Sequence, residues 1–428
     1  MLTEPDASNL IFASYERKAT RLKGYDQHTR TLSGMRQLFE RAGINVSGFP
    51  IITVTGSKGK GSTSIAAAAL LQGAGLRVGL LTSPHYLSLR ERIRVNGTAL
   101  PSDDYARIIT EMAPALQSVD AALPDDQYLS PTGLFLAVAM RHFEEQHVTA
   151  AVLEVGRGGR YDDVSLIENR VACFTPITGE HLDKLGPTVA DVTWHKTGII
   201  KPGSVVVSAT QSPDVAQQIR EVAAQQHSRV AFIGIQNPQP PVSNPGLFLR
   251  DNVALASAAA RELITAYRMK ASLAGAADVL RRVQFPGRTD RVSDAPVVWV
   301  DGAINRPSAE IFINSVLNES PAPRVLVTAL PHDKDYAGLL DTLAPHVQHL
   351  IVTRVSAGHL VFAADVFAHA QQRSPHATEE PNVTAAFARG TELATAAGTL
   401  WIVGTQSLVR DALSHWQRDL TTLITPLE

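Results

Sequence analysis

Short apolar runs rich in valine and isoleucine recur along the chain, and each ends in a glycine or a polar turn. Uninterrupted apolar runs of this length are typical of strands in a sheet that is buried on both faces. Helical patterns lie between them, which predicts an α/β domain with a largely parallel sheet. In the first two-thirds the expected strands are Pro50–Gly56, Arg77–Ser83, Ala150–Gly156, Val171–Ile177, Ser204–Thr210 and Arg229–Gly234, and the expected helices are Ser62–Ala74, Thr132–Gln146 and Val215–Gln226.

A second series of the same kind begins after Phe285. Between the two series, Phe285–Pro296 contains two prolines, one glycine and four charged residues, so we interpret it as an interdomain linker. Two α/β domains are therefore expected, residues 1–290 and a smaller, Rossmann-like domain of residues 291–428. The expected strands of the second are Val297–Gly302, Arg324–Leu330, His349–Val355 and Thr399–Thr405, with helices over Ala337–Leu343 and Val383–Ala397.

Composition narrows the class of protein without naming a chemistry. The 428 residues carry 39 lysines and arginines against 41 aspartates and glutamates, and this balance argues against a nucleic-acid partner. The single cysteine, Cys173, excludes an intrachain disulfide and a cysteine-based zinc or redox site. The acidic N-terminus does not resemble a signal peptide, and the most apolar stretch, Ser64–Thr82, is too broken to span a bilayer. We expect a cytoplasmic enzyme without a membrane partner.

The sharpest local signal is a glycine-rich turn between an expected strand and an expected helix. Glycines let successive backbone N–H groups point at an anion, and the following helix N-terminus adds its positive dipole end. Lys60 would place a charge near the β- and γ-phosphates of a nucleotide. In the usual phosphate-binding loop the lysine directly precedes the serine, whereas here Gly61 separates Lys60 from Ser62. A glycine-rich turn without a ligand is the alternative. The expected nucleotide-binding residues are Gly56, Ser57, Lys58, Gly59, Lys60, Gly61 and Ser62.

This loop, TGSKGKGS, and the following block LLTSPHYLSLRERIRVNG (Leu80–Gly97) resemble those of the folylpolyglutamate synthase/dihydrofolate synthase family, within the superfamily of Mur-type ligases. Five more blocks follow in the family's order, and the resemblance extends from about Gly43 to Arg410. They are Val152–Asp162, His195–Gly203, Asp251–Ala260, Phe285–Val292 and Asp301–Asn305. The resemblance implies that the first domain is like the central domain of the Mur ligases. It also implies ATP-dependent amide formation between a carboxylate and an amino acid through an acyl phosphate, with release of ADP and phosphate.

The resemblance also implies roles for individual residues. Lys60 would neutralise the transferred phosphate, and Lys196 aligns with a lysine that is carbamylated in many members of the superfamily. Mg²⁺, with two ions conceivable, would be held by Ser62, Ser83, Glu154 and His181. The implied catalytic residues are Lys60, Lys196 and His181, and Asn252, Arg288 and Asp301 would contact ATP between the two domains.

Simpler alternatives exist for most of these residues. Glu154 lies inside an apolar run, where a carboxylate needs a partner, so a structural ion pair competes with a metal role. His181 could be an ordinary loop histidine, because imidazole is an unusual ligand for Mg²⁺. For the remaining positions the alternatives are a helix-end lysine at Lys196, a helix cap at Asn252 and an interdomain salt bridge at Arg288.

Several departures from the family pattern mark a divergent member. Ile304 and Arg306 replace the histidine and proline of DGAHNP, and Arg157 replaces a small or apolar residue. Gly133 and Leu134 stand where the family has an aromatic residue and an acidic one, and Asp163–Ser165 replaces ATN. Three functions stay open: addition of L-glutamate to folate or dihydropteroate, amide ligation of a non-folate acid and amine, and ATP binding without catalysis. A monomer is expected.

Overall fold

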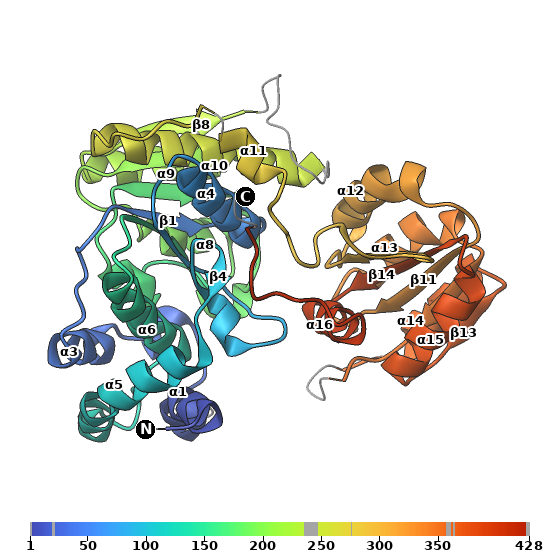
Figure 1. Ribbon diagram of the computed structural model, residues 1–428, viewed down its shortest axis with the longest axis horizontal. Coiled ribbons are helices and arrows are strands. Elements are labelled where there is room, and N and C mark those ends of the chain that lie inside the picture. Colours follow the sequence, from blue (N-terminus) through green and yellow to red (C-terminus); the bar gives the residue numbers. More distant parts are fainter. Residues whose placement is uncertain are drawn as a thin grey trace.

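The computed structural model describes residues 2–18, 22–234, 247–274, 276–356, 361–362 and 364–424, so the proline-rich segment Asn237–Pro245, expected to be a loop, lies outside the described residues. Its elements form two α/β lobes of unequal size, each built on its own sheet (Figure 1). The predicted fold class, with two largely parallel sheets, is confirmed.

The first sheet has eight strands in the order β4-β3-β2-β5-β1-β6-β7-β8. The six strands from β2 to β8 in this order run parallel, and β3 and β4 form an antiparallel edge that the sequence did not predict. Their bounds are β1 Ile51–Thr55, β2 Val78–Leu81, β3 Ile93–Val95, β4 Thr98–Ala99, β5 Ala150–Glu154, β6 Val171–Phe174, β7 Val205–Ala209 and β8 Arg229–Ile233.

Alternate residues of these strands enter two separate cores, one on each face of the sheet. On one face, Val152 of β5 packs with the alanine-rich helix α4 and with α10 and α11. On the other face, Leu153 packs with α1, α3, α5, α6, α8 and α9. The helices are α1 Glu4–Lys18, α2 Asp26–Thr29, α3 Ser33–Ala42, α4 Lys60–Gly73, α5 Ser102–Ala122, α6 Pro131–Glu145, α7 Leu182–Leu185, α8 Val189–Thr197, α9 Pro213–Gln225, α10 Leu247–Ala266 and α11 Ala276–Leu280. Burial on both faces explains why the strands are apolar throughout.

The second sheet has six strands in the order β13-β12-β11-β14-β10-β9, all parallel except β9. Helices α12, α13 and α14 cover one face, and α15 and α16 cover the other. The bounds are β9 Asp290–Asp294, β10 Val297–Asp301, α12 Arg306–Val316, β11 Arg324–Ala329, α13 Tyr336–Leu343, β12 His349–Val352, α14 Ala364–Arg373, β13 Ala377–Glu379, α15 Val383–Ala394, β14 Thr399–Gly404 and α16 Gln406–His415.

The interpretation of Phe285–Pro296 as a linker is wrong for its second half. Residues 290–294 form β9, which pairs antiparallel with β10 at the edge of the second sheet. An edge strand leaves one side open to water and tolerates charged side chains, so Arg291 and Asp294 concealed its strand character. The crossing between domains is therefore shorter than predicted. The division into residues 1–290 and 291–428 stays a prediction.

A second segment also connects the lobes. After α16 the chain runs back to the larger lobe, as the dark red trace of Figure 1 shows, and residues 421–424 pair there with residues 97–99 and 283–284. The buried guanidinium of Arg94 donates to the carbonyl oxygens of Thr421 at 3.0 Å and Leu420 at 2.7 Å. Leu423 and Ile424 are buried in the core below α4. The smaller domain is thus held at two points.

Candidate active site

The glycine loop connects buried β1 to α4, which begins at Lys60, two residues earlier than predicted. Gly56 has a φ of +141°, and a Cβ there would overlap the side chain of Thr175. Gly59 has a φ of +89°, and a Cβ there would lie 2.5 Å from Oδ1 of Asn252. Both positions combine a left-handed backbone with a close neighbour, so only glycine fits. The loop can therefore turn its backbone toward a ligand at the N-terminus of α4.

Three lysines surround one carboxylate beside this loop. The ammonium groups of Lys60 and Lys196 both donate to the carbonyl oxygen of Gly56, at 3.1 and 2.6 Å. The Glu180 carboxylate lies 4.0 Å from Lys60, 3.9 Å from Lys196 and 3.5 Å from Lys58. Burial, together with the neighbouring charge of Lys60, lowers the pKa of Lys196 to about 7. Because cations outnumber the carboxylate, the site favours an anion.

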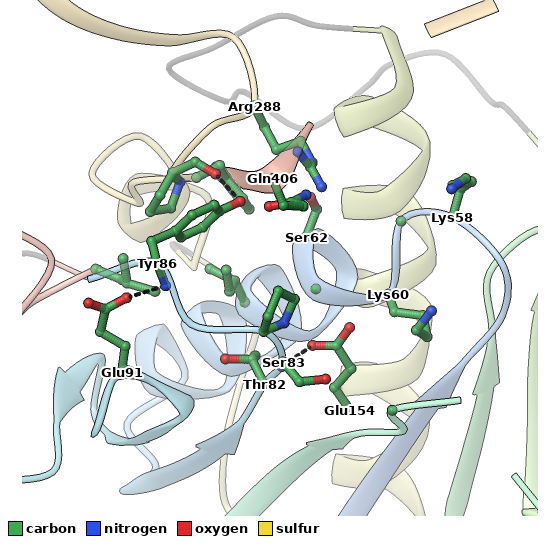
Figure 2. A pocket seen from close by; sticks show the side chains of 18 of the residues that line it. Lys58, Lys60, Ser62, Thr82, Ser83, Tyr86, Glu91, Glu154, Arg288 and Gln406 are labelled. Atoms are coloured by element: carbon green, nitrogen blue, oxygen red, sulfur yellow. Dashed lines mark hydrogen bonds between the residues drawn. The ribbon is translucent and has the colours of Figure 1, made fainter. Parts of the chain in front are cut away.

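Glu154 ends β5 and is almost fully buried. Its carboxylate accepts one hydrogen bond from the backbone N–H of Ser83, at 2.9 Å. Burial raises the pKa of Glu154 to about 7, although the charge of Lys60 acts in the opposite direction. Figure 2 shows Glu154, Ser83 and Ser62 around one cavity, with Lys60 beside them. The predicted juxtaposition of these side chains is present.

His181 does not share this cavity. It is an exposed residue that precedes α7 with a φ of +53°, on the side of the lysine cluster. Among the described residues there is no group of three or more histidine, cysteine, aspartate or glutamate side chains placed to hold a metal ion. The predicted ligand set contains only two residues of these types, so its other oxygens must come from serines and a ligand. The metal role of His181 stays a prediction.

The cavity lies between the two domains and has a volume of about 300 Å³. The glycine loop and Thr82, Ser83, Pro84 and Tyr86 line it on one side, and Arg288 and Gln406 approach from the other (Figure 2). Asp301, at the end of β10, does not line the cavity but accepts a hydrogen bond from the N–H of Thr289 at 2.7 Å. Burial raises the pKa of Asp301 to about 6, against the nearby charge of Arg288. Asp301 thus fixes the backbone next to Arg288.

Asn252 lies on α10 and is 5% exposed. It lines a second cavity, of about 200 Å³, together with Lys58 and Gly59. Its Nδ2 group is buried and has no hydrogen-bond partner in the described part of the chain. An unsatisfied buried donor is costly, so a ligand acceptor at this point would stabilise the site. The alternative role of Asn252 as a helix cap does not fit, because it lies inside α10.

Tyr86 and Gln406 are lining residues that the sequence analysis missed. Tyr86 belongs to the block around Ser83, and its hydroxyl donates to the carbonyl oxygen of Pro286 in the interdomain crossing, at 3.1 Å. Gln406 lies two residues after the end of β14, at the start of α16, and its buried Oε1 has no partner among the described residues. Its place after the carboxyl end of a parallel strand is the signal that could have identified it.

Three departures from the family pattern, Arg157, Gly133 and Asp163, lie in one cluster whose members do not line the cavity. Arg157 makes two hydrogen bonds to the buried carboxylate of Asp26, at 3.0 and 2.6 Å. Asp163 is held by Arg30 and Ser130, and burial raises its pKa to about 6. A Cβ on Gly133 would lie 2.8 Å from Cγ of Asp163, so the glycine makes room for that carboxylate. These residues form one charged network.

Mg²⁺ and a nucleotide fit the residues present. Glu154 is a buried carboxylate that accepts the backbone N–H of Ser83 and has no ion-paired cation in the described part of the chain, and the hydroxyls of Ser62 and Ser83 line the same cavity. Oxygen ligands of this kind suit Mg²⁺. The orphaned Nδ2 of Asn252 and the positive loop suit the base and the phosphates.

The fold and site define a P-loop ligase of the Mur type, and residues 54–249 match the model of the Mur ligase middle domain. The chain is 28% identical over 339 residues to dihydrofolate synthase/folylpolyglutamate synthase of Bacillus subtilis, covering 73% of this chain and 78% of that one. It is 30% identical over 379 residues to human mitochondrial folylpolyglutamate synthase, covering 78% of this chain and 63% of the relative. Over most of its length the chain is thus similar to members of the folylpolyglutamate synthase/dihydrofolate synthase family.

Solved structures agree on the fold. The folylpolyglutamate synthase of Mycobacterium tuberculosis complexed with ADP and AMPPCP superposes with a TM-score of 0.82 at 24% identity, covering 97% of this chain and 100% of that one. The apo form of the Lactobacillus casei (L. casei) enzyme gives a TM-score of 0.83 at 21% identity, with the same coverage. No helix in the described part of the chain has the length and apolar character needed to cross a membrane.

Proposed function

We propose that the protein is an ATP-dependent ligase that joins a carboxylate to the amino group of an amino acid and releases ADP and phosphate. The observation that carries this proposal is the shared cavity. The loop with Lys60, the buried Glu154 and Arg288 from the domain crossing all face one interdomain space. Such a space can hold a nucleotide and a second substrate together and exclude water when the domains close.

The chemistry requires activation, because a carboxylate at neutral pH has no leaving group. The acid attacks the γ-phosphorus of ATP, the bond to the bridging oxygen breaks, and ADP leaves with an acyl phosphate remaining. The amine then attacks the acyl carbon, loses a proton, and phosphate departs. The protein positions the reactants and neutralises charge. Lys60 and Lys58 would neutralise the phosphates, and Arg288, Asn252 and the residues around Asp301 would orient the nucleotide. Mg²⁺ held by Ser62, Ser83 and Glu154 would supply further neutralisation.

Lys196 is suited to carbamylation. Only an uncharged amine adds to CO₂, and this addition gives a carbamate and releases one proton. The lowered pKa of Lys196 provides the uncharged amine near neutral pH. The carbamate would replace one of three clustered positive charges by a negative one and could pair with Lys60. A carbamylated lysine is then a further oxygen ligand for substrate or for a second Mg²⁺.

The proposed substrates are L-glutamate and folate or dihydropteroate, on the strength of the relatives' names. A second candidate is a different acid–amine pair. The charged network of Arg157, Asp26, Arg30 and Asp163 supports it, because the family has a small or apolar residue where Arg157 stands and alanine where Asp163 stands. We also propose that the protein acts as a monomer in the cytoplasm.

Phosphate release from ATP distinguishes these candidates. It would be measured with L-glutamate together with dihydropteroate or tetrahydrofolate, and then with a panel of other acids and amines. Glutamate- and folate-dependent release supports the first candidate. Turnover only with another pair supports the second. If ATP binds but no pair causes release, the chain is a catalytically silent relative and the proposal is refuted.

A further inference from the structure

The loop of residues 82–92 is held rigidly between the domains. The buried carboxylate of Glu91 accepts the backbone N–H groups of Tyr86 at 3.1 Å, Leu87 at 3.0 Å and Ser88 at 2.7 Å (Figure 2 shows the first). The Tyr86 ring packs against the core of the second domain. A loop with its backbone fixed in this way presents its neighbouring side chains in defined positions.

Two of these side chains are His85 and Arg92. The Nε–H of Arg92 donates to Nδ1 of His85 at 3.2 Å, which leaves the other ring nitrogen, Nε2, to carry the proton of the neutral imidazole. The guanidinium carbon of Arg92 lies 4.6 Å from the centre of the Phe135 ring. Throughout the described ranges, no aspartate or glutamate lies within ion-pair distance of Arg92. Its remaining N–H groups are donors that lack a carboxylate.

The second domain brings another arginine to the same place. A Cβ on Gly287 would touch both Val409 of α16 and the Tyr86 hydroxyl, so α16 lies next to the loop. Arg410 is the residue after Val409, and His85 is the residue before Tyr86. Burial, with smaller contributions from the charges of Arg92 and Arg410, lowers the pKa of His85 to about 4. Arg410 is 3.3 Å from Asp411, but that carboxylate is also hydrogen-bonded by the N–H and hydroxyl of Ser356.

We propose that His85, Arg92 and Arg410 form an interdomain site for a carboxylate group of the incoming amino acid. This inference rests on the proposed function, since it identifies where that substrate is held. His85, Arg92 and Arg410 lie outside the lining of the cavity, but Ser83, which lines it with Glu154, is only two residues from His85. A carboxylate anchored here would therefore place the amine of the same molecule toward the activated acid. Like charges from two domains repel each other, and an anion between them replaces that repulsion by attraction. Binding of the amino acid therefore favours domain closure.

Equilibrium binding of L-glutamate, in the presence of Mg²⁺ and ADP, tests the site. We expect Arg410→Gln and Arg92→Gln to weaken glutamate binding by about tenfold or more, the scale of one charge-assisted hydrogen bond, and to leave ADP affinity unchanged. Arg354→Gln is the matched control, because this exposed arginine of the second domain faces Glu379 and should change glutamate affinity less than about twofold. Arg410 is partly exposed, so its variant should fold even if Arg92→Gln does not.

Inorganic phosphate serves as the second probe, because it is an anion that the proposed reaction also releases. Arginine-dependent binding of phosphate but not of glutamate would overturn the assignment, as would unchanged glutamate affinity in Arg410→Gln or no binding of either anion by the unmodified protein. The two proposals fail separately. An unmodified protein that forms no amide refutes the proposed function, even if arginine-dependent glutamate binding supports the site. A fully active Arg410→Gln variant with an unchanged KM for the amino acid refutes only the site.

Discussion

The ammonium of Lys196 lies 2.6 Å from the carbonyl oxygen of Gly56, the first glycine of the phosphate loop. The two residues are 140 positions apart, yet Lys60 donates to the same oxygen. One carbonyl therefore holds two lysines side by side, with Glu180 as their shared carboxylate. This arrangement lets the protonation of one lysine depend on the other.

The first prediction concerns the pH dependence of carbamylation. The pKa of Lys196 is lowered to about 7, so the amine is largely uncharged above pH 7 and becomes protonated below it. At limiting bicarbonate, we expect turnover to fall by about tenfold for each pH unit below 7, because the reactive fraction of the amine falls in that proportion. Added bicarbonate should recover part of the loss. Lys196→Gln should be inactive and insensitive to bicarbonate, and a variant with full activity would contradict the role of Lys196.

The ionised carboxylate of Glu154 should lower the free energy of unfolding of the ligand-free protein. Its pKa is raised from 4.5 to about 7, so the folded state holds the proton more tightly than the unfolded state between these values. Stability is then lost as pH rises from about 4.5 to 7, and the full cost is present above pH 7. Glu154→Gln should stabilise the ligand-free protein at pH 8 by about 1–3 kcal/mol and leave it nearly unchanged at pH 4.5.

Urea unfolding at the two pH values measures this difference, and Mg²⁺-dependent phosphate release should be lost in the same variant. A Glu154→Gln protein that is less stable at pH 8 would show that Glu154 has a structural cation as its partner. That result would support the ion-pair alternative and contradict the metal role.

Arg94 should hold the C-terminal tail. Its guanidinium donates to the carbonyl oxygens of Gly97, Thr421 and Leu420. The first two oxygens also accept a backbone N–H, so in the described part of the chain Arg94→Met would leave only the Leu420 carbonyl without a donor. We expect a loss of about 1–3 kcal/mol in the free energy of unfolding, the cost of one buried unpaired polar group. Arg281→Met is the control, because the pair of Arg281 with Asp278 is exposed, and its effect should stay within about 0.5 kcal/mol. Equal effects of the two variants would refute the role of Arg94 in holding the C-terminal segment.

Gly59 should be required for ATP binding because of its contact with Asn252, and not only because of its backbone conformation. Gly59 and Gly75 both have a φ of +89°, but a Cβ on Gly75 meets nothing within 4 Å, whereas one on Gly59 meets the Asn252 amide. Gly75→Ala should therefore cost about 1 kcal/mol of stability and leave ATP affinity unchanged. Gly59→Ala should weaken ATP binding at least about tenfold as well, measured by nucleotide titration, because Asn252 must move. If the two variants bind ATP equally well, the contact between Gly59 and Asn252 has no role in binding.

The layered α/β architecture and the location of the phosphate loop could be predicted from the sequence alone. Strands such as Ala150–Glu154 are apolar because both faces of the sheet are covered, and this pattern is local enough to be recognised without the fold. The ends of such strands also predicted that Ser83 and Glu154 would meet. The edge strand β9 was missed, because an exposed edge permits charged residues that resemble a linker.

The electrostatic state of the site and the way the domains are joined depend on contacts between residues far apart in the sequence. The pKa of Lys196 depends on burial and on Lys60, and the clamp on the tail joins Arg94 to residues more than 300 positions away. His85, Arg92 and Arg410 likewise come together only when α16 packs against the loop. Desolvation and charge–charge interactions depend on burial and on distances in space. Local sequence patterns do not give these distances for residues that are far apart along the chain.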